Sequence, residues 1–199
     1  MKKPKFETRD GLRQLHSITT SFETREADDG SLHICGYFAV FGPVYEMNRW
    51  QSESIAPGAF RNCLDSDVRA LTTHDTTLVL GRTTARTLTL REDERGLWGD
   101  IIVNQRDLDA MNTYERVKRG DVSQCSFGFY VLDEQTTIRD DGGEHYTLKE
   151  VELLEVSVCT FPAYAETGVK ARSRQLAEIQ AREDLEAWKE QNRRKLNHA

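Results

Sequence analysis

The chain has 199 residues, of which 38% are hydrophobic and 30% charged, with a formal net charge of -6 at pH 7. This length suffices for one sizeable hydrophobic core with some chain to spare. The acidic charge argues against a general nucleic-acid-binding protein, which normally carries a basic surface. No apolar run approaches the roughly 20 residues that span a bilayer, and the start, MKKPKFETRDG, lacks the apolar stretch of a secretory signal. We therefore expect a cytosolic protein that binds neither nucleic acid nor membrane.

The four cysteines give no sign of a metal or redox centre. Cys35, Cys63, Cys125 and Cys159 are scattered without any Cys-x-x-Cys pairing. Three of them lie in strand-like sequence and are interpreted as small core residues. His33 and Cys35 form an isolated His-x-Cys, which falls short of a ligand set. We expect no metal and no cofactor.

The first third of the chain is predicted to be mainly extended. Residues 15–26 alternate weakly, as a solvated strand does, and a hairpin turn is expected over 26–30. The run SLHICGYFAVFG, residues 31–42, is aromatic and strongly β-prone. The segment SESIAPGAFRNCLD, residues 52–65, is interpreted as a loop that leads into a short helix, with Pro57 near its first turn.

The rest of the body alternates strand candidates with a single helix. A helix is predicted over residues 107–119 from apolar residues at a spacing of three, with Gly120 as its stop. Period-two runs bounded by turn residues predict strands over 68–75, 85–93, 96–103, 123–137 and 145–160, the last two joined by a turn at 140–143.

Beyond Pro162 the composition changes. Residues 169–199 are rich in helix formers and in charges of both signs, and their apolar stripe is too narrow for a separate domain. This segment is interpreted as a peripheral helix, an assembly arm or a disordered tail. We predict a mainly β (α+β) domain over 1–168 with two short helices, closed or nearly closed as a β-barrel, and a helical C-terminal extension over 169–199.

The stretch DVSQCSFGFYV presents one hydroxyl on an otherwise regular strand. Alternation places Ser126 and Gly128 on one face, and Cys125, Phe127 and Phe129 on the other, which should point into the core. A serine in such a place is most often bonded to a neighbouring carbonyl group. It becomes a candidate nucleophile only where the fold supplies a base.

Two further residues could complete such a site. His74 follows the strand VRALTT, at a polar strand end of the kind that often lines a cleft. The alternative is an ordinary surface histidine. Glu155 is a carboxylate inside the apolar strand LLEVSVC, where a charge is costly unless it is paired. A salt bridge to an arginine is the other explanation for Glu155.

Nucleophilic acyl transfer would unite these three side chains. A serine hydroxyl needs an imidazole to take its proton, and the imidazole works best when an acid fixes its tautomer. His74, Ser126 and Glu155 come from separate predicted strands, so the sequence leaves their convergence open.

A set of motifs, taken in order, resembles the prohead proteases of tailed phages. These motifs are GYFAVFG, IAPGAF, LTTHDTTLVLGRTTARTLTLREDERGLWGDIIV, DVSQCSFGFYV and LLEVSVCTFPAYAE, and the match runs from about Ile34 to Glu166. The family is related in fold to the herpesvirus assemblins, so the resemblance implies a barrel of the herpesvirus-protease type. It also implies that Ser126 is the nucleophile, His74 the general base and Glu155 the orienting acid. Cys125, on the opposite face, is interpreted as a core residue.

One feature of the assemblins is missing. They use an arginine pair after the strand of the third residue to stabilise the oxyanion, and the corresponding stretch here, TFPAYAE, contains no arginine. Backbone N–H groups around Ala163 and Tyr164 are one hypothesis for that role. Arg82 and Arg86 are the others.

The resemblance implies a serine endopeptidase of capsid maturation. Its expected partners are the major capsid protein or its scaffolding segment, and the chain itself through autoproteolysis, with a homo-oligomer as an open possibility. It would act in the cytoplasm of the bacterial host, inside assembling proheads, and could trim its own C-terminal tail. The alternative is a non-catalytic capsid assembly or scaffolding module on the same barrel. A metal-dependent hydrolase would need a ligand cluster that the sequence does not show.

Overall fold

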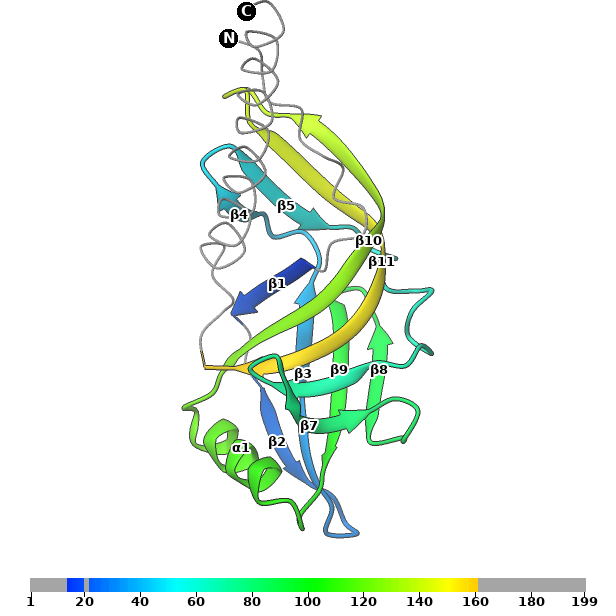
Figure 1. The fold of residues 1–199 in the computed structure, drawn as a ribbon, viewed down its shortest axis with the longest axis vertical. Helices are drawn as coiled ribbons and strands as arrows, with labels where there is room; N and C mark the ends of the chain where they lie inside the picture. The colour runs from blue at the N-terminus through cyan, green and yellow to red at the C-terminus, as the bar shows by residue number, and fades with distance from the viewer. Residues whose placement is uncertain (1–13, 20–21, 161–199) are drawn as a thin grey trace, which may run out of the picture. The chain divides into compact units, whose positions relative to one another are not determined.

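The structure is a computed structural model that describes residues 14–19 and 22–160 (Figure 1). The predicted helical extension over 169–199, and the domain boundary at residue 168, lie outside these residues. Within the described part, β-strands make up most of the chain and one helix accompanies them. The prediction of a mainly β (α+β) protein is therefore confirmed.

The larger sheet is built around two long strands. β10 (Gln124–Ile138) and β11 (Glu144–Cys159) pair antiparallel and sweep through the length of the sheet (Figure 1). The sheet has seven strands in all, and the others are β1 (Gln14–Thr19), β4 (Tyr45–Asn48), β5 (Gln51–Ile55), β6 (Arg69–Thr72) and β7 (Asp75–Arg82). β1 pairs with the far edge of β10. β5 and β6 pair parallel to successive parts of β11, so β11 organises the whole sheet.

The smaller sheet has four strands in the order β2-β3-β9-β8. Their bounds are β2 (Glu23–Glu26), β3 (Leu32–Val40), β8 (Leu88–Glu92) and β9 (Gly96–Val103). The two sheets pack through apolar side chains, and the Cys125 thiol of β10 donates to the Tyr37 carbonyl of β3 at 3.2 Å. Cys125 is thus a core residue, on the side of β10 opposite Ser126, as the alternation predicted.

The expected closed barrel is not observed among the described residues. The backbone hydrogen bonds form two separate ladders, so the strands do not pair continuously around an axis. The reason lies in how the core is filled. Phe60, in the turns after β5, packs edge-on against Phe127 of β10 with ring centroids 5.4 Å apart, and it stacks on Phe41, directly after β3, at 6.4 Å. Aromatic side chains thus join the two layers where a barrel would need strand pairing.

One of the two predicted short helices exists. α1 (Leu108–Arg119) is capped at its start by Asp107, whose carboxylate accepts hydrogen bonds from the N–H groups of Asp109 and Ala110. At its end the cap is Gly120, in the left-handed conformation. The other prediction, within residues 52–65, is wrong. That segment starts as β5, which pairs with β11, and continues as turns in which Gly58 has a φ of 95°.

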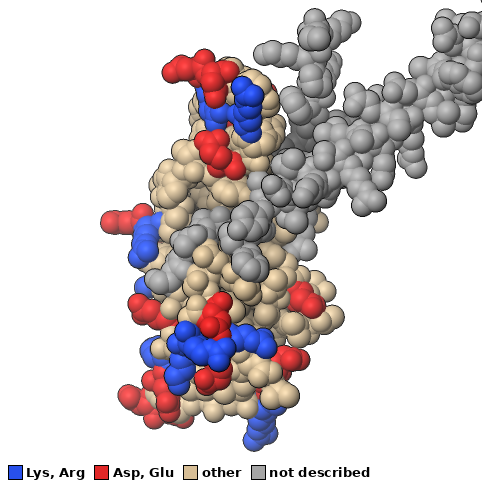
Figure 2. All heavy atoms as spheres, turned by 90° about the vertical axis from the view of Figure 1, so that its left-hand side faces the viewer, with Lys and Arg blue, Asp and Glu red and all other residues tan. Residues whose placement is uncertain are grey.

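Charges of both signs lie side by side on the face shown in Figure 2. Ion pairs of this kind occur in the described chain, where Arg139 contacts Glu46 at 2.9 Å and Asp141 at 2.7 Å. Among the described residues on this face, Lys and Arg form no extended basic patch of the kind that attracts nucleic acid.

Candidate active site

His74 lies at the tip of the hairpin formed by β6 and β7. The register pairs Thr72 with Asp75, so the turn consists of Thr73 and His74 alone. Both have positive φ, 53° and 61°, as a two-residue type I′ turn requires. Asn and Gly normally fill such turns, and a β-branched threonine there costs of order 1–3 kcal/mol. Strain of this size is retained where the position of a side chain matters.

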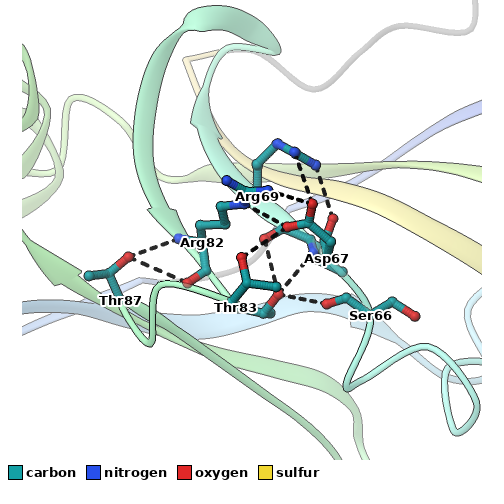
Figure 3. Close-up of polar contacts among 8 residues, drawn as sticks. Ser66, Asp67, Arg69, Arg82, Thr83 and Thr87 are labelled. Atoms are coloured by element: carbon teal, nitrogen blue, oxygen red, sulfur yellow. Dashed lines mark hydrogen bonds and ion pairs between the residues drawn. The ribbon is translucent and has the colours of Figure 1, made fainter.

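The other end of this hairpin is fixed by polar contacts (Figure 3). Arg82 of β7 donates to both carboxylate oxygens of Asp67, at 2.6 and 2.7 Å, and Arg69 of β6 donates to one of them at 3.0 Å. The Arg82 hydrogen bond holds the pKa of the Asp67 carboxyl well below its usual range. The Thr83 hydroxyl donates to the backbone carbonyl oxygen of Ser66, in the loop before β6, at 2.6 Å. Arg82 is thus committed to Asp67, which weakens the hypothesis that it stabilises an oxyanion.

Glu155 is the partner of His74. The carboxylate is 3% exposed, and its Oε1 lies 2.6 Å from Nδ1 of His74, whereas Oε2 accepts the hydroxyl of Ser157 at 2.7 Å. A buried carboxylate is tolerated when both of its oxygens are hydrogen-bonded in this way. An imidazole that donates from Nδ1 to Glu155 keeps its lone pair on Nε2. The pair therefore has the orientation that a general base requires.

Ser126 shares a sheet face with this pair. In the β10–β11 ladder Ser126 lies opposite Ser157, and Gly128 lies opposite Glu155. Directly opposed residues of an antiparallel pair project to the same side, with Cβ atoms about 4.5–5.5 Å apart. The fold thus brings His74 and Glu155 into contact and places Ser126 on the neighbouring strand of the same face.

The hydroxyl of Ser126 is not bonded to His74. It donates to the backbone carbonyl oxygen of His16 on β1 at 2.8 Å, and the residue is fully buried. β1 pairs side by side with this part of β10 in the same sheet, with Ser17 opposite Ser126. Ser126 thus makes the carbonyl contact typical of a structural serine.

β1 is held in place through the side chain of His16. Its Nδ1 lies 2.9 Å from Oε1 of Glu53 on β5, and both side chains are nearly inaccessible to solvent. The ring also stacks on Phe127, with centroids 5.3 Å apart, and contacts Tyr45 at 4.7 Å. One residue therefore supplies both the carbonyl group over Ser126 and the anchor of the strand.

Cys159 contacts the second ring nitrogen of His74. Its Sγ lies 3.9 Å from Nε2, the one contact of that nitrogen within the described chain. Burial, and then the charge of Glu155, raise the pKa of the Cys159 thiol to about 12. Because the thiolate is the nucleophilic form, Cys159 is inert near neutral pH.

A second serine–histidine–carboxylate arrangement lies on the smaller sheet. His33 contacts Asp100 through Nδ1 at 2.7 Å and Ser31 through Nε2 at 2.9 Å. The Ser31 hydroxyl, however, donates to Asp29 at 2.6 Å, and Arg25 binds Asp100 at 2.9 Å. Sequence reasoning missed this cluster, because nothing local signals that β9 brings Asp100 to β3.

Other kinds of site find little support in the described chain. No group of three or more His, Cys, Asp or Glu side chains in residues 14–19 and 22–160 could hold a metal ion. No helix in the same ranges is long and apolar enough to cross a membrane. Ala163 and Tyr164, the hypothetical oxyanion donors, lie outside the described residues.

Comparison with known proteins identifies relatives. Residues 20–182 match the family model described as caudovirus prohead serine protease. The prohead protease of Enterobacteria phage HK97 is 30% identical over 158 residues, covering 77% of this chain and 67% of that protein. The solved structure of the bacteriophage T4 capsid assembly protease is similar in fold, with a TM-score of 0.52 at 10% identity, covering 74% of this chain and 96% of that one. The chain therefore belongs to the caudovirus prohead serine protease family, a family of serine peptidases.

Proposed function

We propose that this chain is an endopeptidase of prohead maturation that cleaves scaffold or capsid protein, and itself, with Ser126 as nucleophile, His74 as general base and Glu155 as orienting acid. The observation that carries the proposal is the 2.6 Å contact between His74 and the buried Glu155, made from a strained turn. The relatives named for prohead and capsid assembly supply the substrate class.

The chemistry follows from this assignment. Ser126 Oγ attacks the carbonyl carbon of the scissile peptide while Nε2 of His74 takes its proton, and Glu155 stabilises the imidazolium that forms. The tetrahedral intermediate collapses when the imidazolium returns that proton to the leaving amine, and an acyl-enzyme remains. Water, deprotonated by the same nitrogen, then releases the acid product and regenerates the Ser126 hydroxyl.

Catalysis by Ser126 requires a change at β1. A fully buried hydroxyl that donates to His16 can neither meet a substrate nor give its proton to His74. We infer that β1 leaves β10 in the active enzyme, by displacement or by cleavage, and that the described arrangement is the closed one. The separate anchor of β1, the His16–Glu53 pair, makes this strand a discrete element that can move while β10 and β11 stay paired.

The test is co-expression of the full chain with the major capsid protein of its own phage. The wild type is expected to shorten the capsid protein or itself, as seen by intact-mass spectrometry, and Ser126→Ala should stop both reactions while the protein stays folded. Processing at the wild-type rate by Ser126→Ala would overturn the nucleophile assignment.

The closed state of Ser126 is also the one observation that favours a non-catalytic scaffolding role. On that alternative, the wild type would leave both proteins intact when co-expressed and would bind the capsid protein equally well with or without the Ser126 hydroxyl.

A further inference from the structure

Ser157 joins the two halves of the proposed catalytic pair. Its hydroxyl donates to Oε2 of Glu155 at 2.7 Å and accepts the backbone N–H of His74 at 3.2 Å. The imidazole of His74 meets the other oxygen of the same carboxylate. One small side chain therefore contacts the backbone of the proposed base and the carboxylate of the proposed acid.

The contact to the His74 N–H lies in the strained part of the chain. Thr73 and His74 both have positive φ, and the Thr73 N–H is bonded to the Val158 carbonyl at 2.9 Å. Two successive N–H groups of the turn are thus fixed by β11, one through the backbone and one through the Ser157 side chain. Without that hydroxyl, the His74 N–H and Oε2 of Glu155 would each lose a partner in a buried setting.

Ser157 is placed to hold other groups and is not placed to react. It is fully buried, and its proton is engaged by Glu155. Its hydroxyl oxygen faces the backbone nitrogen of His74, whereas the ring nitrogen that carries the lone pair faces Cys159. These contacts separate it from Ser126, whose hydroxyl meets only a main-chain carbonyl.

We propose that Ser157 is a positioning residue, which sets the direction of the His74 imidazole by tying the turn to the carboxylate that the imidazole meets. The proposal rests on the proposed roles of His74 and Glu155. A displacement of a catalytic group by about 1 Å can cost about 10²-fold in rate. Loss of the Ser157 hydroxyl removes one restraint on His74 and one on Glu155. We therefore expect the rate of the chemical step to fall by about 10²-fold.

The experiment compares Ser157→Ala with a matched control, Ser52→Ala. Ser52 is also fully buried in the larger sheet, and its hydroxyl also contacts a histidine, the Nδ1 of His145 at 2.9 Å. Both variants lose one buried hydroxyl and should lose similar thermal stability. The readout is saturable labelling of the full chain by an aryl phosphonate, which separates the limiting inactivation rate from the half-saturating concentration.

The proposal predicts that Ser157→Ala lowers the limiting rate about 10²-fold, leaves the half-saturating concentration within about twofold, and speeds hydrogen exchange at the His74 amide. Ser52→Ala should change none of these. Ser157→Cys, which keeps the shape with a weaker donor, should give an intermediate rate, and it replaces Ser157→Ala if that variant fails to fold.

Two results would overturn the proposal. Equal limiting rates in Ser157→Ala and Ser52→Ala would make Ser157 a structural serine. Phosphonate found on Ser157 in the wild type would make it the nucleophile. A wild-type chain that takes up no phosphonate at any serine, and that leaves both itself and the co-expressed capsid protein intact, would instead contradict the proposed function itself.

Discussion

Two serine–histidine–carboxylate clusters lie in the described part of the chain, and the one whose serine contacts its histidine is not the one that we propose as catalytic. Ser31, His33 and Asp100 are joined by contacts of 2.9 and 2.7 Å, as a finished triad would be. Ser126 makes no bond to His74 in the described chain, and its hydroxyl is engaged by a main-chain carbonyl. Hydrogen-bond length alone would select the Ser31 cluster, whereas the proposed function places catalysis at Ser126.

The difference lies in where the protons are held. The Ser31 hydroxyl donates to Asp29 at 2.6 Å, so its proton is not directed at His33. Arg25 also neutralises Asp100. At the other cluster, within the described residues, the one polar contact of His74 Nε2 is a thiol at 3.9 Å. Glu155 contacts His74 through one oxygen and Ser157 through the other. A free lone pair backed by a buried carboxylate is what general-base catalysis needs.

The largest expected effect separates the two histidines. His74→Ala should lower peptidase or phosphonate-labelling rates by about 10³-fold or more, because the base is lost, whereas His33→Ala should stay within about threefold of wild type. Equal labelling rates in His74→Ala and His33→Ala would contradict a base at His74.

The two carboxylates give a second, smaller contrast. Glu155→Gln keeps the shape but not the charge that stabilises the imidazolium, so we expect a loss of roughly 10²-fold, less than for His74→Ala. Asp100→Asn should leave the rate nearly unchanged. The rates are compared at equal folded fractions, judged by circular dichroism, since each change removes a partly or fully buried charge. A larger loss in Asp100→Asn than in Glu155→Gln would reverse the assignment of the two clusters.

The smallest effect concerns the cover over Ser126. His16→Ala removes the side chain that anchors β1 to Glu53, so phosphonate should label Ser126 faster. The labelling rate should rise about tenfold for each 1.4 kcal/mol by which the closed form is destabilised. Hydrogen exchange over residues 14–19 should quicken in parallel. The control is His145→Ala, a histidine of the same sheet bonded to Ser52 and Ser54. Faster exchange without faster labelling would show that β1 does not limit access.

The sequence predicted much of the fold, for reasons that can be traced to local signals. The α1 helix was predictable because Asp107 and Gly120 are strong local caps, and most strands because their apolar residues alternate. β5 was mistaken for part of a loop and helix, since its burial comes from pairing with a distant part of β11. β7 was missed because the turn before it uses Thr73 and His74, residues that rarely occupy a type I′ turn.

The residues of the proposed site could be predicted from the sequence, but their arrangement in this structure could not. Glu155 could be found because a carboxylate in an apolar strand needs a partner, and His74 is such a partner. Ser157 gave no comparable signal, since a serine in a buried strand is ordinary. The pairing of β1 beside Ser126 could not be predicted either, because residues 14–19 and 124–129 are more than a hundred positions apart in the sequence.

The most direct test of the account is to locate the adduct of a serine-reactive aryl phosphonate on the wild-type chain by peptide mass spectrometry. With Ser126 as the nucleophile, a single adduct is expected on Ser126, which disappears in Ser126→Ala and persists in Ser31→Ala. An adduct on Ser31 that persists when Ser126 is replaced would contradict it.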